Sequence, residues 1–278
     1  GLRGSFTADG QGRYNRGMTT NRQTALVTGA SAGLGTEFAR LFARDGHDVI
    51  LVARSEGPLR KLAEELTAAH RARCEVIAAD LADPASCERV HAEVQRRGLQ
   101  VDFLVNNAGF GSSGAFLDQD LTSEVGMVEV NVAALLRLCH LFGREMRARG
   151  HGRILNIASS AGFQPGPYMA TYFATKAFVV MFSQALSYEL KDSGVTVTCH
   201  CPGATATSFA QRAGNQNSKL FQRPGVATAA DVAAHAYSAM LRGEALSIHG
   251  LPNQIGVFLS RLAPRSLAAS IAASLNKS

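Results

Sequence analysis

Short runs rich in valine, isoleucine and leucine alternate along this chain with longer stretches in which leucine and alanine recur every three or four residues. The short runs predict buried strands, and the longer stretches predict helices. Their alternation is typical of successive strand–helix–strand units, so the sequence predicts a doubly wound α/β fold with a parallel sheet and helices on both faces. We expect strands at residues 24–28, 48–53, 74–79, 102–106, 153–158, 195–201 and 245–249. We expect helices at residues 34–44, 59–70, 121–149 and 172–190.

Length and composition favour one domain. The chain has 278 residues, of which 46% are hydrophobic, and this is enough for one sizeable core. No internal repeat or linker interrupts the alternation. We therefore expect a single catalytic domain at residues 21–278, after a disordered or tag-like tail at residues 1–20. Its C-terminal part should supply a substrate loop and, on either side of Pro264, two helical pieces that pack against the same chain or a sister subunit.

Charge and cysteine content narrow the possible partners. The formal net charge is +6, but the basic residues are scattered or lie where helices should end, so we expect no nucleic-acid partner. No stretch of about 18 uninterrupted apolar residues is present, which predicts no membrane span. The cysteines form no C-x-x-C pair, which predicts reduced thiols, no metal site and a cytoplasmic protein. They are Cys74, Cys87, Cys139, Cys199 and Cys201.

A glycine-rich turn follows the first expected strand and leads directly into a helix. It reads Thr-Gly-Ala-Ser-Ala-Gly-Leu-Gly over residues 28–35. Glycines at such a corner let the backbone approach a pyrophosphate, whose charge is favoured by the free N–H groups and the dipole of the helix N-terminus. Glycine also serves any tight corner, but the position after the first strand favours a dinucleotide site. The expected contacts are Gly29, Ser31, Gly33, Leu34 and Gly35.

The end of the second expected strand distinguishes NAD from NADP. An acidic residue there would bind the ribose hydroxyls and repel a 2′-phosphate. This chain has Ala53 at that point, followed by Arg54 and Ser55. A guanidinium beside the missing acid favours NADP(H) over NAD(H), although Arg54 could instead be a solvated residue that follows a strand.

A tyrosine and a lysine lie four residues apart after the fifth expected strand. Tyr172 and Lys176 therefore share one helical face, and Ser159 follows the strand itself. A free tyrosine has a pKa of about 10, and a nearby ammonium favours the phenolate and lowers that pKa. Ser159 could hydrogen-bond a substrate oxygen as charge develops on it. Taken singly, the three residues could be a core aromatic, a solvated lysine and a helix cap, but together with the glycine-rich turn they favour a catalytic site.

These motifs resemble those of the short-chain dehydrogenase/reductase family. The family's Thr-Gly-x-x-x-Gly-x-Gly turn corresponds to residues 28–35, its Asn-Asn-Ala-Gly to residues 106–109 and its Tyr-x-x-x-Lys to residues 172–176. Its Pro-Gly pair corresponds to residues 202–203, and the resemblance is close over about residues 24–207. It implies a Rossmann-like fold, an NAD(P)-dependent oxidoreductase and a homodimer or homotetramer.

The resemblance also implies roles that the residue pattern alone does not. Asn131 would order a water beside the catalytic lysine, and Asn107 would hold the central strand and the cofactor ribose. Asp80 would bind the adenine, and Thr205 or Thr207 would meet the nicotinamide end. The remaining expected cofactor contacts are Leu81, Ala108, Gly109, Pro202 and Gly203.

The expected reaction is the reversible reduction of a ketone or aldehyde to an alcohol by NADPH, with Tyr172 as acid and base and Lys176, Asn131 and water replenishing its proton. Ser159 would fix and polarise the carbonyl. We expect a small hydrophobic substrate because the residues expected near it are mostly apolar, although the same side chains could simply close the core. They are Phe110, Phe163, Pro165, Tyr168, Met169 and Phe209.

Three alternatives differ from this hypothesis. The chain could sense NADP(H) without turnover, act as an NAD-linked alcohol dehydrogenase of the same family, or act on sugar nucleotides as an epimerase or dehydratase. The complete Ser, Tyr, Lys and Asn set argues against the first, and the glycine spacing and the short C-terminal region argue against the third. Residues 205–225 break the periodicity and form either a mobile lid or an ordinary surface loop.

Overall fold

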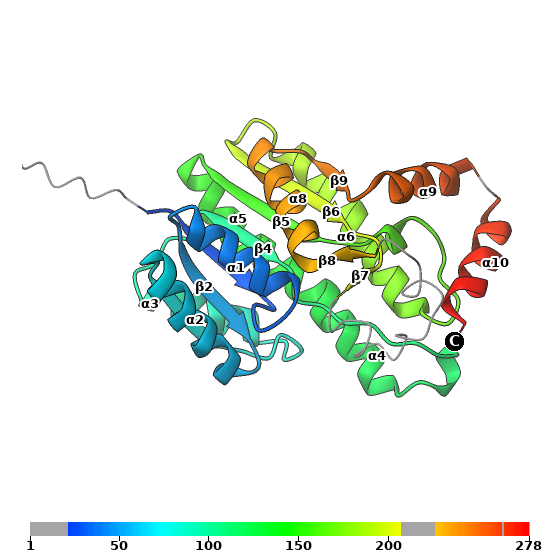
Figure 1. Cartoon of the computed structure of the whole chain (residues 1–278), viewed down its shortest axis with the longest axis horizontal. Helices are drawn as coiled ribbons and strands as arrows, with labels where there is room; N and C mark the ends of the chain where they lie inside the picture. The colour runs from blue at the N-terminus through cyan, green and yellow to red at the C-terminus, as the bar shows by residue number, and fades with distance from the viewer. Residues whose placement is uncertain (1–21, 207–225, 263, 278) are drawn as a thin grey trace, which may run out of the picture.

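A seven-stranded parallel sheet forms the centre of the molecule (Figure 1). The computed structural model describes residues 22–206, 226–262 and 264–277. The strand order is β3-β2-β1-β4-β5-β6-β9, so the order reverses between β1 and β4. Such a reversal opens a crevice at the carboxyl ends of the strands. The strands are β1 (Thr24–Thr28), β2 (Asp48–Ala53), β3 (Cys74–Ala78), β4 (Phe103–Asn106), β5 (Gly152–Ile157), β6 (Val195–Cys201) and β9 (Leu246–Ile248).

Helices cover both faces of the sheet. Helices α1, α2 and α8 contribute to one hydrophobic core, and α3, α5 and α6 contribute to the other. The strands are therefore buried on both sides, which is why they read as continuous apolar runs. The predicted doubly wound, Rossmann-like α/β fold is confirmed. The helices are α1 (Leu34–Arg44), α2 (Glu56–His70), α3 (Ser86–Arg96), α4 (Leu121–Val128), α5 (Leu135–Arg149), α6 (Ala170–Glu189), α8 (Ala229–Arg242), α9 (Leu251–Leu262) and α10 (Arg265–Asn276).

The long helix predicted at residues 121–149 is present, with a wider turn inside it. Helix α4 continues through a π-helical stretch, Glu129–Ala134, into α5. Within the described ranges this run alone is long and apolar enough to cross a membrane. Its Leu138 and Phe142 side chains are buried in the core beneath the sheet, as is typical of a core helix.

Some boundaries differ from the predictions for local reasons. Helix α2 begins at Glu56, three residues before the predicted start, because Pro58 is tolerated in a first helical turn, where no N–H donor is required. Helix α3 was not predicted: Cys87, Val90 and Val94 are its only buried apolar residues, and the rest of the segment is mostly charged or polar. The two helical pieces expected around Pro264 are confirmed as α9 and α10.

Two predictions concern residues outside the described ranges. The tail at residues 1–20 is one, and most of the segment at residues 205–225 is the other. The ends of that segment lie together, because β7 (Thr205–Ala206) pairs with β8 (Ala227–Thr228).

A buried histidine connects β6 with β9 and α8. His200 is fully buried, and its Nδ1 lies 3.2 Å from the Ser247 hydroxyl, which in turn lies 3.4 Å from Nδ1 of His235. Burial lowers the pKa of His200 from 6.5 to about 3, and the neighbouring His235 and His249 add to this. The folded chain therefore keeps His200 neutral, whereas the unfolded chain takes up a proton at this position below about pH 6.5.

We therefore expect the free energy of unfolding to fall as the pH drops below 6.5. With these two pKa values, His200 lowers that free energy by about 2 kcal/mol between pH 7.5 and pH 5. Urea unfolding of His200→Gln should show a weaker pH dependence over this range, whereas His140→Gln, at an exposed position of α5, should not. Equal pH dependence in His200→Gln and the wild type would contradict the assignment.

Candidate active site

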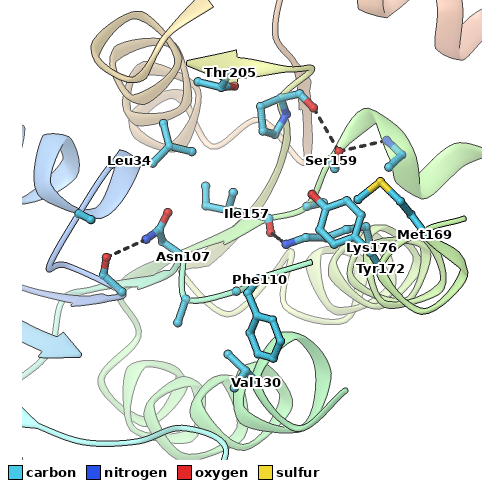
Figure 2. A pocket seen from close by; sticks show the side chains of 18 of the residues that line it. Leu34, Asn107, Phe110, Val130, Ile157, Ser159, Met169, Tyr172, Lys176 and Thr205 are labelled. Atoms are coloured by element: carbon cyan, nitrogen blue, oxygen red, sulfur yellow. Dashed lines mark hydrogen bonds between the residues drawn. The ribbon is translucent and has the colours of Figure 1, made fainter. Parts of the chain in front are cut away.

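The carboxyl ends of β1, β4, β5 and β6 open into one cavity (Figure 2). It encloses about 660 Å³ and lies where the strand order reverses between β1 and β4. Ligands of open parallel sheets bind at this kind of position, and the volume is in the range of small-molecule sites. Residues that follow β1, β2, β3, β4, β5 and β6 all contribute to its wall.

The structure brings most of the predicted site residues together. Gly35 and Asn131 do not line the cavity, and Thr207 lies outside the described residues. The predicted residues that do line it are Gly29, Ser31, Gly33, Leu34, Arg54, Asp80, Leu81, Asn107, Ala108, Gly109, Ser159, Tyr172, Lys176, Pro202, Gly203 and Thr205.

The glycine-rich turn leaves room for a ligand at the start of α1. Gly29 has a φ of 65°, and a Cβ there would lie 2.9 Å from Nδ2 of Asn107. Gly33 is the N-cap residue of α1, and no side chain caps the helix there, so the first N–H groups are available to an anion. A Cβ on Gly35 would lie 2.2 Å from the Gly29 carbonyl oxygen, so Gly35 allows close packing of the helix on the turn.

One buried hydroxyl connects this turn to the end of β4. Thr28 Oγ1 donates to the Val105 carbonyl at 3.2 Å and accepts the N–H groups of Asn107 and Ala108, each at 3.0 Å. The Asn107 side chain donates to the Thr28 carbonyl at 2.9 Å. The Asn107 carboxamide thus connects the end of β1 with the residue that follows β4 and lies beside the turn.

The other half of the expected dinucleotide site follows β2 and β3. Arg54 and Ser55 are exposed and line the cavity after β2. Asp80 is exposed as well, and its carboxylate accepts the N–H of Ala82 at 3.1 Å, which shapes the loop after β3. Leu81 is buried and contributes an apolar part of the wall.

A buried polar network holds α6 against the sheet. The Asn106 side chain on β4 donates to Oδ1 of Asn156 on β5 at 2.9 Å, and Asn156 donates to the Ser183 hydroxyl on α6, also at 2.9 Å. The Cys139 thiol of α5 accepts a second hydrogen bond from Asn106 at 3.2 Å. These buried hydrogen bonds connect β4, β5 and α6, and they thereby position the helix that carries Tyr172.

Ser159, Tyr172 and Lys176 meet at the end of β5. The Ser159 hydroxyl caps the short turn that follows, accepting the N–H of Ala161 at 3.1 Å, and donates to the Pro202 carbonyl at 3.4 Å. The phenol oxygen of Tyr172 points toward Ser159 in Figure 2. Lys176 Nζ donates to the Ile157 carbonyl at 2.9 Å and lies 5.8 Å from the centre of the Tyr172 ring.

Burial moves the pKa values of the tyrosine and the lysine in opposite directions. Burial raises the pKa of Tyr172 from 10 to about 12, although a hydrogen bond with Ser159 acts in the opposite direction and lowers it. Burial also lowers the pKa of Lys176 from 10.5 to about 8, although the nearby Cys199 and Cys201 act in the opposite direction and raise it. The predicted lowering of the Tyr172 pKa by the ammonium is absent in the chain alone, because the low-dielectric surroundings disfavour the phenolate more strongly.

Asn131 lies behind the cavity wall, in the π-helical stretch. It is buried, accepts the Phe110 N–H at 3.0 Å and donates to the Phe110 carbonyl at 2.9 Å. It also donates to the Thr175 hydroxyl at 3.1 Å, one residue before Lys176. Its water-ordering role stays a prediction.

The residues expected to contact substrate are only partly placed there. Phe110 and Met169 line the cavity, whereas Phe163 packs against the core and Pro165 is exposed. Tyr168 does not line the cavity, and Phe209 lies outside the described residues. The sequence did not predict several residues that line the cavity. The apolar ones fit a helical pattern, but that pattern does not show that they face the cavity. They include Ser123, Val130, Gln164, Phe173, Ala272, Leu275 and Asn276.

Comparisons with known proteins agree with this geometry. The family model described as short chain dehydrogenase matches residues 23–218. A monensin polyketide synthase protein from Streptomyces virginiae, named as a ketoacyl reductase, is 36% identical over 266 residues, which cover 93% of this chain and 96% of the relative.

Solved structures with the same architecture include ligand complexes. A short-chain dehydrogenase from Sphingobium yanoikuyae in complex with NADPH is similar with a TM-score of 0.77 and 34% identity, covering 86% of this chain and 94% of that one. A bulky-bulky ketone specific alcohol dehydrogenase from Comamonas testosteroni has a TM-score of 0.74 and 33% identity, covering 87% and 93%. Sequence and fold are thus similar to the same kind of protein over most of the chain.

Gly29→Ala should weaken the binding of NADP(H) by about tenfold or more, because the added Cβ meets both Asn107 and the Ala108 backbone. Gly98→Ala is the matched control: Gly98 has a similar φ of 64°, but a Cβ there meets no atom within 4 Å. Isothermal titration calorimetry measures both affinities. Unchanged affinity in Gly29→Ala would contradict the assignment of this turn.

Proposed function

Because the chain belongs to the short-chain dehydrogenase/reductase family, we propose that this oxidoreductase reduces a ketone or an aldehyde to the alcohol with NADPH. The observation that carries the proposal is the shared cavity: Ser159, Tyr172 and Lys176 line the same space as the open N-terminus of α1. An anionic dinucleotide and a proton donor can therefore meet there.

The residues present fit a nicotinamide dinucleotide. The backbone of residues 29–34 forms the cradle for the pyrophosphate, and the loops after β2 and β3 flank the adenosine region. Bound NADPH supplies a hydride for the carbonyl carbon, while the proton for the oxygen comes from the protein.

Tyr172 donates that proton. Its pKa of about 12 in the chain alone keeps the phenol protonated at neutral pH, so the donor form is the resting form. Ser159 faces the phenol and can hydrogen-bond the same carbonyl oxygen, polarising the carbonyl as negative charge develops. Lys176 is mostly protonated at pH 7 with a pKa of about 8, and its ammonium stabilises the phenolate that remains after transfer.

Arg54 supports NADPH rather than NADH. Its exposed guanidinium lines the cavity just after β2, next to Ala53, where an NAD-specific site would place an acid. The NADPH-bound similar structure from Sphingobium yanoikuyae supports the same choice. A guanidinium and a phosphate form strong charge-assisted hydrogen bonds, and the loss of these discriminates against NADH.

The wall beyond the tyrosine supports a hydrophobic substrate. Phe110 and Val130 lie together on one side, and Met169 lies beside Tyr172 (Figure 2). Phe173 adds a further apolar surface. The similar ketone-specific alcohol dehydrogenase and the similar ketoacyl reductase act on carbonyl groups by their names, which supports a ketone as the substrate here.

We also propose a cytoplasmic homo-oligomer. All five cysteines are free thiols, which suits a reducing compartment. Leu136, Met181 and Tyr188 of the α5 and α6 region are exposed apolar side chains, which supports a contact between copies of the chain there.

Tyr172→Phe should lower kcat for ketone reduction by about 100-fold or more, because it removes the general acid. The Kd for NADPH, measured by fluorescence titration, should change by less than about threefold, since the ring remains in place. NADPH absorbance is followed with a panel of ketones and aldehydes. Tight NADPH binding without turnover of any carbonyl would instead support a cofactor sensor, and full activity in Tyr172→Phe would contradict the role of the tyrosine.

Arg54→Ala should raise the Kd for NADPH by about tenfold or more and leave the Kd for NADH nearly unchanged, because only NADPH carries the 2′-phosphate. Arg60→Ala on α2 is the control, since Arg60 is exposed and does not line the cavity. An equal loss for both cofactors, or better use of NADH by the wild type, would contradict the preference.

A further inference from the structure

The inner face of the C-terminal helix forms part of the cavity wall. Ala272, Leu275 and Asn276 of α10 line the same cavity as Tyr172, although they lie about a hundred residues further along the chain. Ala268 and Ala272 are buried, whereas Leu267 and Ile271 on the opposite face are exposed. The helix therefore turns small side chains toward the protein, and Ala272 is one of those that line the cavity.

A single side chain fastens the end of α10 to the catalytic region. Asn276 is 1% exposed, and its Nδ2 donates to the Pro167 carbonyl at 3.0 Å. Pro167 belongs to the loop between Ser159 and Tyr172, so this bond sets α10 against the segment that leads into the catalytic helix. No hydrogen-bond partner within the described parts of the chain serves Oδ1 of Asn276.

The hydrogen bond to Pro167 holds the end of α10 against the loop that precedes α6. Because Asn276 also lines the cavity, this bond fixes the position of that part of the cavity wall.

The location of α10 indicates that this helix contacts the substrate and not the dinucleotide. Helices α9 and α10 lie at the edge of the molecule opposite α1, α2 and α3 (Figure 1). The dinucleotide cradle is at the α1 end, so the catalytic residues lie between the cradle and α10. The far part of the cavity is bounded by α10 together with Met169 and Phe173.

We propose that α10 is the selectivity wall of the site: Ala272 sets how large one substituent of the ketone can be, and Asn276 is the positioning residue that holds the wall. This inference rests on the proposed carbonyl reduction and adds the class of substrate. The ketone carries a bulky apolar substituent, which extends from the carbonyl at Tyr172 toward Ala272 and Leu275.

The test uses phenyl alkyl ketones from acetophenone to 1-phenyloctan-1-one with the full-length chain and NADPH. Ala272→Phe should lower kcat/KM for the longest ketone that the wild type reduces by about tenfold or more, because one lost or blocked apolar contact has this effect in a hydrophobic pocket. Acetophenone should lose less than about threefold. Ser270→Phe is the matched control, since Ser270 lies on the exposed face of the same helix and should change neither value.

Asn276→Ala should affect the same long ketones through KM, with kcat for acetophenone and the Kd for NADPH unchanged, because the catalytic residues keep their own contacts. Asn276→Asp retains an acceptor but loses the donor to Pro167, so it should behave like Asn276→Ala. A purely structural role would instead lower activity for every ketone in proportion to folded protein.

Equal loss for short and long ketones in Ala272→Phe would overturn the inference while leaving the proposed function intact. If the wild type turns over no member of the series, the proposed function fails with these ketones. Calorimetric binding of the ketones to the NADP⁺-saturated protein then decides the inference separately: Ala272→Phe should exclude only the long ones, and unchanged binding would overturn it.

Discussion

The Thr28 hydroxyl joins the two central strands at the point where the strand order reverses, and the arrangement of the site depends on it. Thr28 is 1% exposed and makes three hydrogen bonds to β4 and the loop that follows. These bonds hold the Asn107 carboxamide against the turn, which is why residue 29 has no space for a side chain. The open N-terminus of α1 is aimed at the cavity as a consequence.

A buried network of hydrogen bonds connects these strand ends to α6, the helix that carries Tyr172. Asn106, at the end of β4, is connected through Asn156 to Ser183 of α6. One set of strand ends therefore positions the cradle for the dinucleotide and the helix that bears Tyr172. For the proposed reaction, donors held in these positions before substrate binds would stabilise the negative charge that develops on the carbonyl oxygen. Burial keeps Tyr172 protonated and brings the pKa of Lys176 down to about 8.

The sequence predicted those parts of the fold and the site that depend on residues close together in the chain. The strands and most helices follow from the spacing of apolar residues, and the cradle and the Tyr172–Lys176 pair follow from short motifs. The sequence predicts a C-terminal substrate loop and helix but not which residues of α10 reach the cavity, because Ala272 is an ordinary helix residue and the bond between Asn276 and Pro167 spans 109 positions.

The directions in which side chains point were the other feature that the sequence did not predict. Tyr168 was expected beside the substrate, but its backbone has a φ of 66°, which the sequence does not reveal and which changes where the side chain points. The hydrogen bonds of Asn131 to Phe110 occur in a π-helical turn, where residues no longer follow the ordinary helical spacing.

The proposed reaction requires this cavity to bring a hydride donor and the Tyr172 proton donor to the same carbonyl group. It is tested most directly by reducing a ketone with NADPH that carries deuterium on one or the other face of the nicotinamide ring, followed by mass spectrometry of the alcohol. Direct hydride transfer should place one deuterium on the carbinol carbon from one of the two labelled forms and none on that carbon from deuterated water. An unlabelled carbinol carbon with both forms, or carbon-bound deuterium from the solvent, would contradict it.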